Sequence, residues 1–149
     1  MYIAQVNIAK MKDTMESELM SDFVGALEEV NALAESASGF KWRLKGDDDN
    51  AMAIRVFEDN FLIINMSVWE DVESLKSFVY SGRHIDVYRK KKKWFHSMSD
   101  HHMAMWFIEK DHIPTPEEAK EKLSYMNENG ESIHAFTFKG KYSYSDLKK

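Results

Sequence analysis

The side chains best suited to chemistry in this 149-residue chain are amides and hydroxyls on two predicted strands. Residues 2–9 and 61–69 alternate with the two-residue period of a β-strand. One face of this pair carries five residues: Gln5, Asn7, Asn65, Ser67 and Trp69. Buried amides need hydrogen-bond partners, and a row of them facing a cavity can orient a small ligand. Hydrogen bonds within the row, or to bridging water, are an equally open interpretation.

A histidine extends this set of candidates. His84 follows Ser81 and Gly82, which interrupt two predicted helical stretches, and a break of this kind can direct a side chain into a pocket. Imidazole can serve there as an acid, a base or a ligand. It can equally cap a backbone group at the break. Arg43 and Arg55 could clamp a carboxylate, although surface ion pairs are the simpler expectation.

Motifs for metals and cofactors are absent from the sequence. His101 and His102 are adjacent on a predicted strand and point to opposite faces, so they cannot share one ion. No metalloprotease motif, glycine-rich phosphate loop or dinucleotide fingerprint occurs. The chain has no cysteine, which excludes thiolate chemistry and disulfides. We therefore expect neither a metal nor a cofactor.

Charge and hydropathy limit the partners. A net charge of -5 argues against a dedicated nucleic-acid binder. The basic run 89–93 would spread around a helix and form no single face. The N-terminus lacks the pattern of a signal peptide, and no apolar run approaches the roughly 20 residues that cross a bilayer. We expect a cytoplasmic protein without nucleic-acid or membrane partners.

The elements that position the candidates are predicted in the order β-α-β-β-α-β. Strands are expected over 2–9, 40–44, 61–69 and 102–108, and helices over 17–36, 72–79 and 85–98. A further helix should begin after Thr115, with Pro116 first and Glu118 at the capping-box position, and a short strand should cover 135–138. This order is typical of an α+β, ferredoxin-like antiparallel sheet. We expect one domain over 1–138 and a polar, flexible tail over 139–149.

The sheet also predicts an oligomer. Helices should cover one of its faces only, and the other would hold Ile3, Phe61, Ile63 and Trp69. That set is too apolar to remain exposed to water. A homodimer that closes sheet on sheet is the simplest solution.

Several segments resemble an uncharacterised bacterial family, a domain of unknown function of the DUF3291 type. These are residues 3–9, 39–44, 65–70, 78–80 with His84, 94–95 and 135–138. That family belongs to the dimeric α/β-barrel superfamily, alongside antibiotic-biosynthesis monooxygenases. The resemblance implies a ferredoxin-like dimeric barrel and no assigned activity.

Haem-degrading members of the superfamily place an asparagine on the first strand, and a tryptophan and a histidine on the second helix. Asn7 matches the asparagine, whereas Phe78 and Tyr88 take the other two positions. Both departures argue against haem cleavage, although tyrosine can ligate haem iron.

The leading hypothesis is a homodimeric barrel that binds a small molecule on the polar face of its sheet. The candidate ligand-binding residues are Gln5, Asn7, Asn65, Ser67, Trp69, His84 and Tyr88. Two alternatives stay open. One is a monooxygenase-like enzyme acting on an aromatic or polycyclic substrate, and the other is a non-catalytic dimerisation module.

Overall fold

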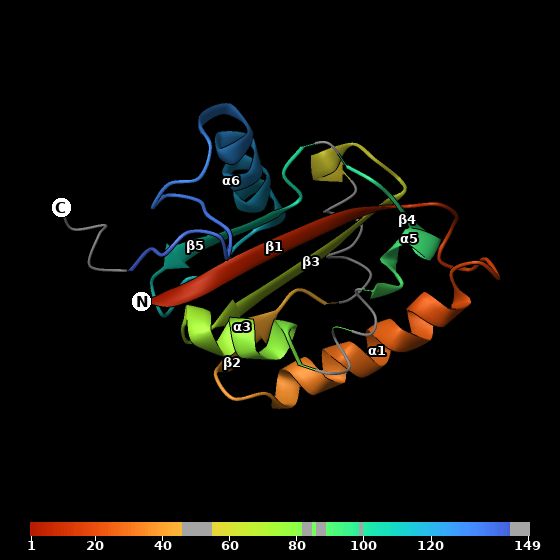
Figure 1. The fold of residues 1–149 in the computed structure, drawn as a ribbon, viewed down its shortest axis with the longest axis horizontal. Coiled ribbons are helices and arrows are strands. Elements are labelled where there is room, and N and C mark those ends of the chain that lie inside the picture. The colour runs from red at the N-terminus through yellow and green to blue at the C-terminus, as the bar shows by residue number, and fades with distance from the viewer. Residues whose placement is uncertain (46–54, 82–84, 86–88, 99, 144–149) are drawn as a thin grey trace.

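The computed structural model describes residues 1–45, 55–81, 85, 89–98 and 100–143, and shows a sheet between two helical layers (Figure 1). Its elements are β1 (Tyr2–Met11), α1 (Ser21–Ser36), β2 (Phe40–Arg43), β3 (Leu62–Trp69), α3 (Val72–Val79), α5 (Lys91–Trp94), β4 (Phe95–His96), β5 (Met103–Ile108) and α6 (Pro116–Asn129). The antiparallel strands follow the order β2-β3-β1, with β5 and the short β4 on the other edge of β1. The predicted α+β, ferredoxin-like class is confirmed.

The register between β1 and β3 defines the two faces of the sheet. Gln5 lies opposite Ser67, and Asn7 lies opposite Asn65. Successive side chains on a strand alternate between faces, so these four residues project from one face, here called the row face. The even-numbered residues of both strands project from the other, here called the α6 face.

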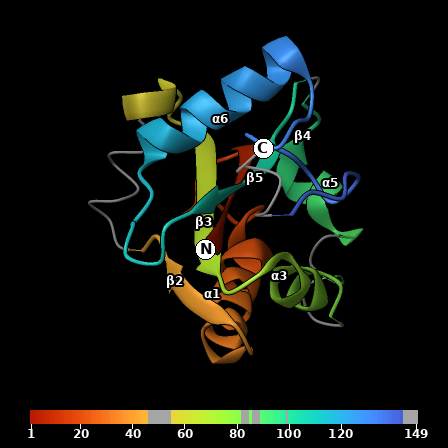
Figure 2. The same cartoon turned by 90° about the vertical axis from the view of Figure 1, so that its left-hand side faces the viewer.

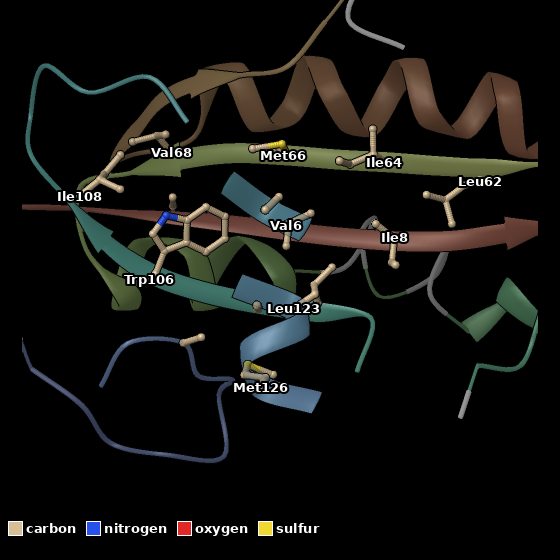
Figure 3. Close-up of a cluster of buried hydrophobic side chains, with 14 residues drawn as sticks. Val6, Ile8, Leu62, Ile64, Met66, Val68, Trp106, Ile108, Leu123 and Met126 are labelled. Carbon is tan, nitrogen blue, oxygen red and sulfur yellow. The ribbon is translucent and has the colours of Figure 1, made fainter. Parts of the chain in front are cut away.

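The α6 face is an entirely apolar core. Alternate residues of the central strands pack against α6, with Trp106 of β5; they are Val6 and Ile8 of β1 and Leu62, Ile64, Met66 and Val68 of β3 (Figure 3). The helix contributes Ala119, Leu123 and Met126, whose spacing of four and three residues places them on one side of it. Thr115 caps the helix as predicted, because its Oγ1 accepts from the backbone nitrogen of Glu118 at 3.2 Å.

The row face is covered by α1 and α3. At one end of β1, Ile3 and Trp69 pack with Ala34 of α1 and Leu75 of α3. At the other end, Met11 packs with Phe23 of α1 and with Trp94. Figure 2 shows α6 on one side of the strands and α1 and α3 on the opposite side.

The expectation that helices leave one face uncovered is therefore wrong. Ile3, Ile63 and Trp69 lie under α1 and α3, and α6 covers the opposite face. Phe61 precedes β3 and is exposed. The apolar face that predicted a sheet-on-sheet dimer is thus filled by helices of the same chain.

The helix predicted over 85–98 also requires correction. The helical stretch α5 ends at Trp94, and Phe95 and His96 pair with Met11 and Lys10 of β1. The pairing of β5 with β1 ends at Asn7, so the remaining backbone groups of the longer β1 need another partner. The short strand β4 provides it.

The C-terminal part of the chain returns to the sheet. Phe136 forms an isolated antiparallel bridge with Met105, so the segment predicted as a strand over 135–138 lies beside β5 but is not a regular strand. Of the predicted tail, residues 139–143 are described, and the ring of Tyr142 lies 4.9 Å from that of Phe136. No helix within the described ranges has the length and apolar character needed to cross a membrane.

Candidate functional site

Four polar side chains form a row across the two central strands. This polar row consists of Gln5 and Asn7 on β1 with Asn65 and Ser67 on β3. Gln5 and Ser67 are each 6% exposed, whereas Asn7 and Asn65 are exposed. The row therefore has a buried end and an open end. The prediction that these four residues lie side by side on one face of the sheet is confirmed.

Hydrogen bonds connect the buried end of the row. Gln5 Nε2 donates to Asn65 Oδ1 at 2.7 Å and to Ser67 Oγ at 2.8 Å. Ser67 Oγ also accepts from Trp69 Nε1 at 2.8 Å. Buried polar groups are stable only with such partners, so this network holds the amide of Gln5 in one orientation.

Trp69 closes the buried end of the row. It stacks on Phe78 of α3 with ring centroids 5.3 Å apart, and meets Phe40 edge-on at 5.4 Å. Phe78 thus packs on the row face. Because its indole nitrogen is engaged by Ser67, Trp69 shapes the site and orients Ser67.

At the open end, Asn7 and Asn65 face each other across the strands. The side chain of Asn7 makes no hydrogen bond within the described part of the chain. A second aromatic cluster follows, in which the ring of Phe23 lies 5.4 Å from Trp94 and 4.8 Å from Phe95. The polar row is thus flanked by aromatic side chains at both ends.

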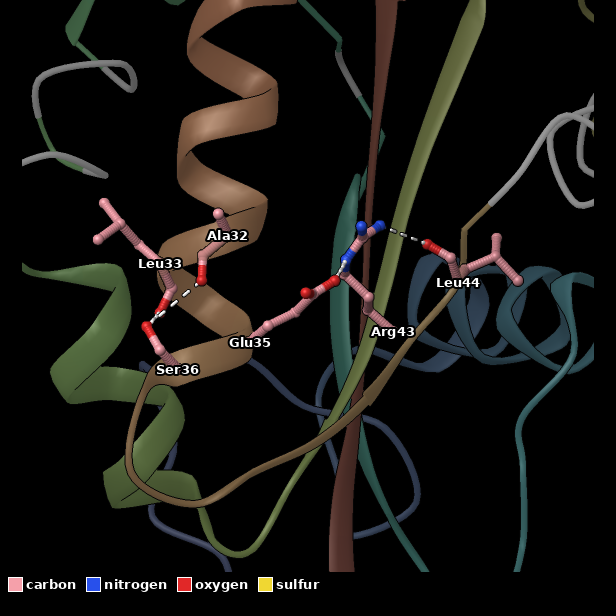
Figure 4. A network of polar contacts seen from close by, with 6 residues as sticks. All are labelled: Ala32, Leu33, Glu35, Ser36, Arg43 and Leu44. Carbon is pink, nitrogen blue, oxygen red and sulfur yellow. Dashed lines mark hydrogen bonds and ion pairs between the residues drawn. The ribbon is translucent and has the colours of Figure 1, made fainter.

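The remaining predicted site residues, His84 and Tyr88, lie outside the described residues. Arg43 forms the surface ion pair that was the simpler expectation, with its Nε 2.6 Å from Glu35 Oε1 (Figure 4). It also donates to the carbonyl of Leu44 at 3.3 Å. The guanidinium of Arg43 is therefore bonded to neighbouring groups at the surface and does not contribute to the polar row.

Sequence reasoning missed a second polar cluster, at the start of α6. The carboxylate of Glu118 accepts from Trp106 Nε1 at 2.6 Å, and its other oxygen lies 2.6 Å from His112 Nε2. The capping-box pattern predicted instead that Glu118 would reach back to the helix start. A buried tryptophan on β5 needs a partner for its indole N–H, which was the available signal.

Two surface hollows are lined by described residues. One, of about 620 Å³, runs along α6 beside Val56 and contains Glu121 and Tyr125. The other, of about 290 Å³, lies between Tyr2, Asp71 and Tyr142. Neither includes a residue of the polar row in its described lining.

Solved structures of other proteins share the fold. A conserved protein from Methanosarcina mazei Go1 is similar with a TM-score of 0.54 and 11% identity, over 72% of this chain and 93% of its own. NE2512, a protein of unknown function from Nitrosomonas europaea, has a TM-score of 0.50 and 11% identity, over 76% and 95%. SnoaB, a cofactor-independent oxygenase from Streptomyces nogalater, has a TM-score of 0.48 and 13% identity, over 76% and 97%. At such identities the likeness to the first two structures concerns the fold alone.

No curated protein matches the chain. The family model described as "Domain of unknown function (DUF3291)" matches residues 2–149. This agrees with the family that the sequence segments resembled. The chain belongs to the DUF3291 family of domains of unknown function.

Proposed function

We propose that this domain binds a small organic molecule at the polar row, on the α1 and α3 side of the sheet. The observation that carries the proposal is the placement of exposed Asn7 and Asn65 beside the buried pair of Gln5 and Ser67. Convergent polar groups within an otherwise apolar surface are the usual composition of a small-molecule site.

The opposite face of the same strands provides a comparison. The α6 face is packed without any amide on β1 or β3, so the fold itself does not require polar side chains at these positions. Burying Gln5 and Ser67 has a desolvation cost that an apolar pair would avoid. A binding role explains why two amides and a hydroxyl accompany Gln5 here.

Binding is favoured over catalysis by the chemistry of the row. Its residues carry only amide and hydroxyl groups, which orient a ligand but do not exchange protons near neutral pH. The monooxygenase-like hypothesis therefore depends on His84 and Tyr88, outside the described residues. We do not extend the proposal to a homodimer or to a dimerisation module, because α1 and α3 of the same chain cover the apolar face that predicted one.

Thermal unfolding with a panel of small carbonyl, hydroxyl and heteroaromatic compounds tests the proposal. Asn7→Ala/Asn65→Ala removes the two exposed amides of the row, and Asn129→Ala removes an amide from α6 as the matched control. A ligand at 100 times its Kd stabilises the folded state by about 2.7 kcal/mol, which shifts Tm by several degrees.

We expect compounds that raise the Tm of the wild type and of the control, and that leave the Tm of the double variant unchanged. A panel without a stabilising compound would refute the proposal. Equal stabilisation of the double variant would place binding elsewhere and refute it as well.

A further inference from the structure

We propose that the polar row recognises a planar group with a hydrogen-bond donor and a hydrogen-bond acceptor on adjacent atoms, as in a lactam or a carboxamide. This inference rests on the proposed function, because it names the ligand chemistry of the same site. It follows from the hydrogen-bonding capacity that Gln5 and Ser67 leave unused.

Ser67 retains one donor. A hydroxyl has two acceptor positions and one hydrogen to donate. Ser67 Oγ accepts from Trp69 Nε1, which can only donate, and from Gln5 Nε2. Both acceptor positions are thereby occupied. Within the described part of the chain, no group accepts the remaining hydroxyl hydrogen.

Gln5 retains one acceptor. Its Nε2 has two hydrogens, and these are donated to Asn65 Oδ1 and to Ser67 Oγ. The carbonyl oxygen Oε1 of Gln5 has no partner among the described residues. A free acceptor and a free donor therefore lie on two residues that face each other across β1 and β3.

Burial makes this unused capacity significant. Gln5 and Ser67 are each only 6% exposed, so bulk water reaches neither group freely. An unsatisfied buried polar group is destabilising, and most such groups in folded proteins have partners. A ligand edge that accepts from Ser67 and donates to Gln5 would satisfy both at once.

The surroundings of the row define the side from which a ligand would approach. Exposed Asn7 and Asn65 mark the open end, one repeat of the strand or about 7 Å from the Gln5 and Ser67 pair. Trp69 closes the buried end of the row and is itself only 1% exposed. A ligand with a polar edge would therefore approach Gln5 and Ser67 from the side of Asn7 and Asn65.

Two probes that differ by one methyl group test this chemistry. 2-Quinolone carries an N–H beside its carbonyl, whereas N-methyl-2-quinolone keeps the carbonyl and loses the donor. The readout is the ¹H–¹⁵N resonance of the Trp69 indole, whose N–H is bonded to Ser67. Trp69→Phe assigns it among the four tryptophans.

We expect 2-quinolone to shift the Trp69 resonance saturably, and N-methyl-2-quinolone to bind about tenfold or more weakly, the equivalent of losing one hydrogen bond of roughly 1.4 kcal/mol. Gln5→Leu should abolish the preference for the N–H compound, and Asn129→Ala should retain it. The probe pair applies to the wild-type chain, so the test does not depend on the folding of Gln5→Leu.

The outcomes separate this inference from the proposed function. Equal binding of the two quinolones would mean that no acceptor of the row is used, and would overturn the inference while small-molecule binding stands. Panel compounds that bind at the row when neither quinolone does would overturn it too. If no compound binds at the row, the proposed function fails and this inference fails with it.

Discussion

Ser67 is the residue on which the polar row depends. Its single oxygen satisfies two buried donors, the amide nitrogen of Gln5 and the indole nitrogen of Trp69. The sequence predicted that these residues share a face, because alternation on a strand is a local property. It could not predict which atom bonds to which, since that depends on the register of two strands separated by some sixty residues.

Ser67→Ala should therefore destabilise the fold strongly for a change of one atom. Two buried N–H groups lose their acceptor, and we expect a loss of about 2 to 4 kcal/mol in the free energy of unfolding. Denaturant unfolding measures it. Ser36→Ala, at an exposed hydroxyl bonded to carbonyls of α1, should change stability by less than about 0.5 kcal/mol. Equal losses for both variants would contradict this account.

Glu118 has a comparable role at the start of α6. Glu118→Ala would leave the indole N–H of buried Trp106 without its acceptor, and we expect a loss of about 1 to 3 kcal/mol. Glu118→Gln keeps an oxygen for Trp106 and should lose less. Glu121→Ala, on an exposed position of the same helix, is the control for helix propensity. Comparing their unfolding curves tests the bond, and a Gln variant as unstable as the Ala variant would contradict its importance.

At the scale of elements, Gly39 joins α1 to β2 and allows α3 to approach. Its φ of +86° is in the left-handed region, where a side chain is strained. A Cβ built there would lie 2.3 Å from Ser74 Oγ and 2.5 Å from Ser74 Cβ on α3. The backbone of Gly39 also accepts from the nitrogen of Glu70 at 2.7 Å. This turn therefore sets the distance between α3 and the row face.

Gly39→Ala should lower the free energy of unfolding by about 2 kcal/mol or more, since backbone strain and the contact with Ser74 both oppose the methyl group. Gly25→Ala is the matched control, in an exposed turn of α1 with no atom within 4 Å of the added carbon. It should stabilise the fold by about 0.5 to 1 kcal/mol. Thermal unfolding of the two variants should thus shift in opposite directions. If both variants changed Tm in the same direction, backbone strain and the contact with Ser74 would not explain the effect of Gly39→Ala.

The elements that the sequence predicted well are those with local signals. β1 and β3 alternate clearly, β5 is a short apolar run, and α6 has Thr115 as its N-cap and Pro116 as its first residue, their preferred positions. The strand that begins at Phe95, inside the helix predicted over 85–98, has no such local signal. It depends on the backbone groups of β1 beyond Asn7, which β5 does not pair. These groups can be identified only when the lengths of the assembled strands are known.

At the scale of the whole molecule, the sequence pattern could not predict which helices cover which face of the sheet. Both faces of β1 and β3 carry enough apolar side chains to receive a helical layer, so alternation defines two faces without saying which element covers each. The sequence pattern predicts the C-terminal helix only as an addition to the β-α-β-β-α-β order. In the structure its residues Ala119, Leu123 and Met126 complete the core of the α6 face.

This arrangement predicts that α6 takes the place of a partner. We expect the full chain not to associate through the α6 face, whereas Leu123→Ser should release α6 and expose that face. Removing a buried leucine from a core costs about 2 to 5 kcal/mol, enough to weaken the docking of one helix. An exposed apolar face of this kind should then drive self-association.

Sedimentation velocity and hydrogen exchange together test the role of α6. In Leu123→Ser, the amides of α6 should lose protection first, while β1 and β3 remain protected by α1 and α3 on the row face. Leu33→Ser, at an exposed leucine of α1, should change neither measurement. A wild-type dimer with α6 still protected would place the interface on another surface. Association of wild type and variant to the same extent would show that α6 is not what prevents pairing of the sheets.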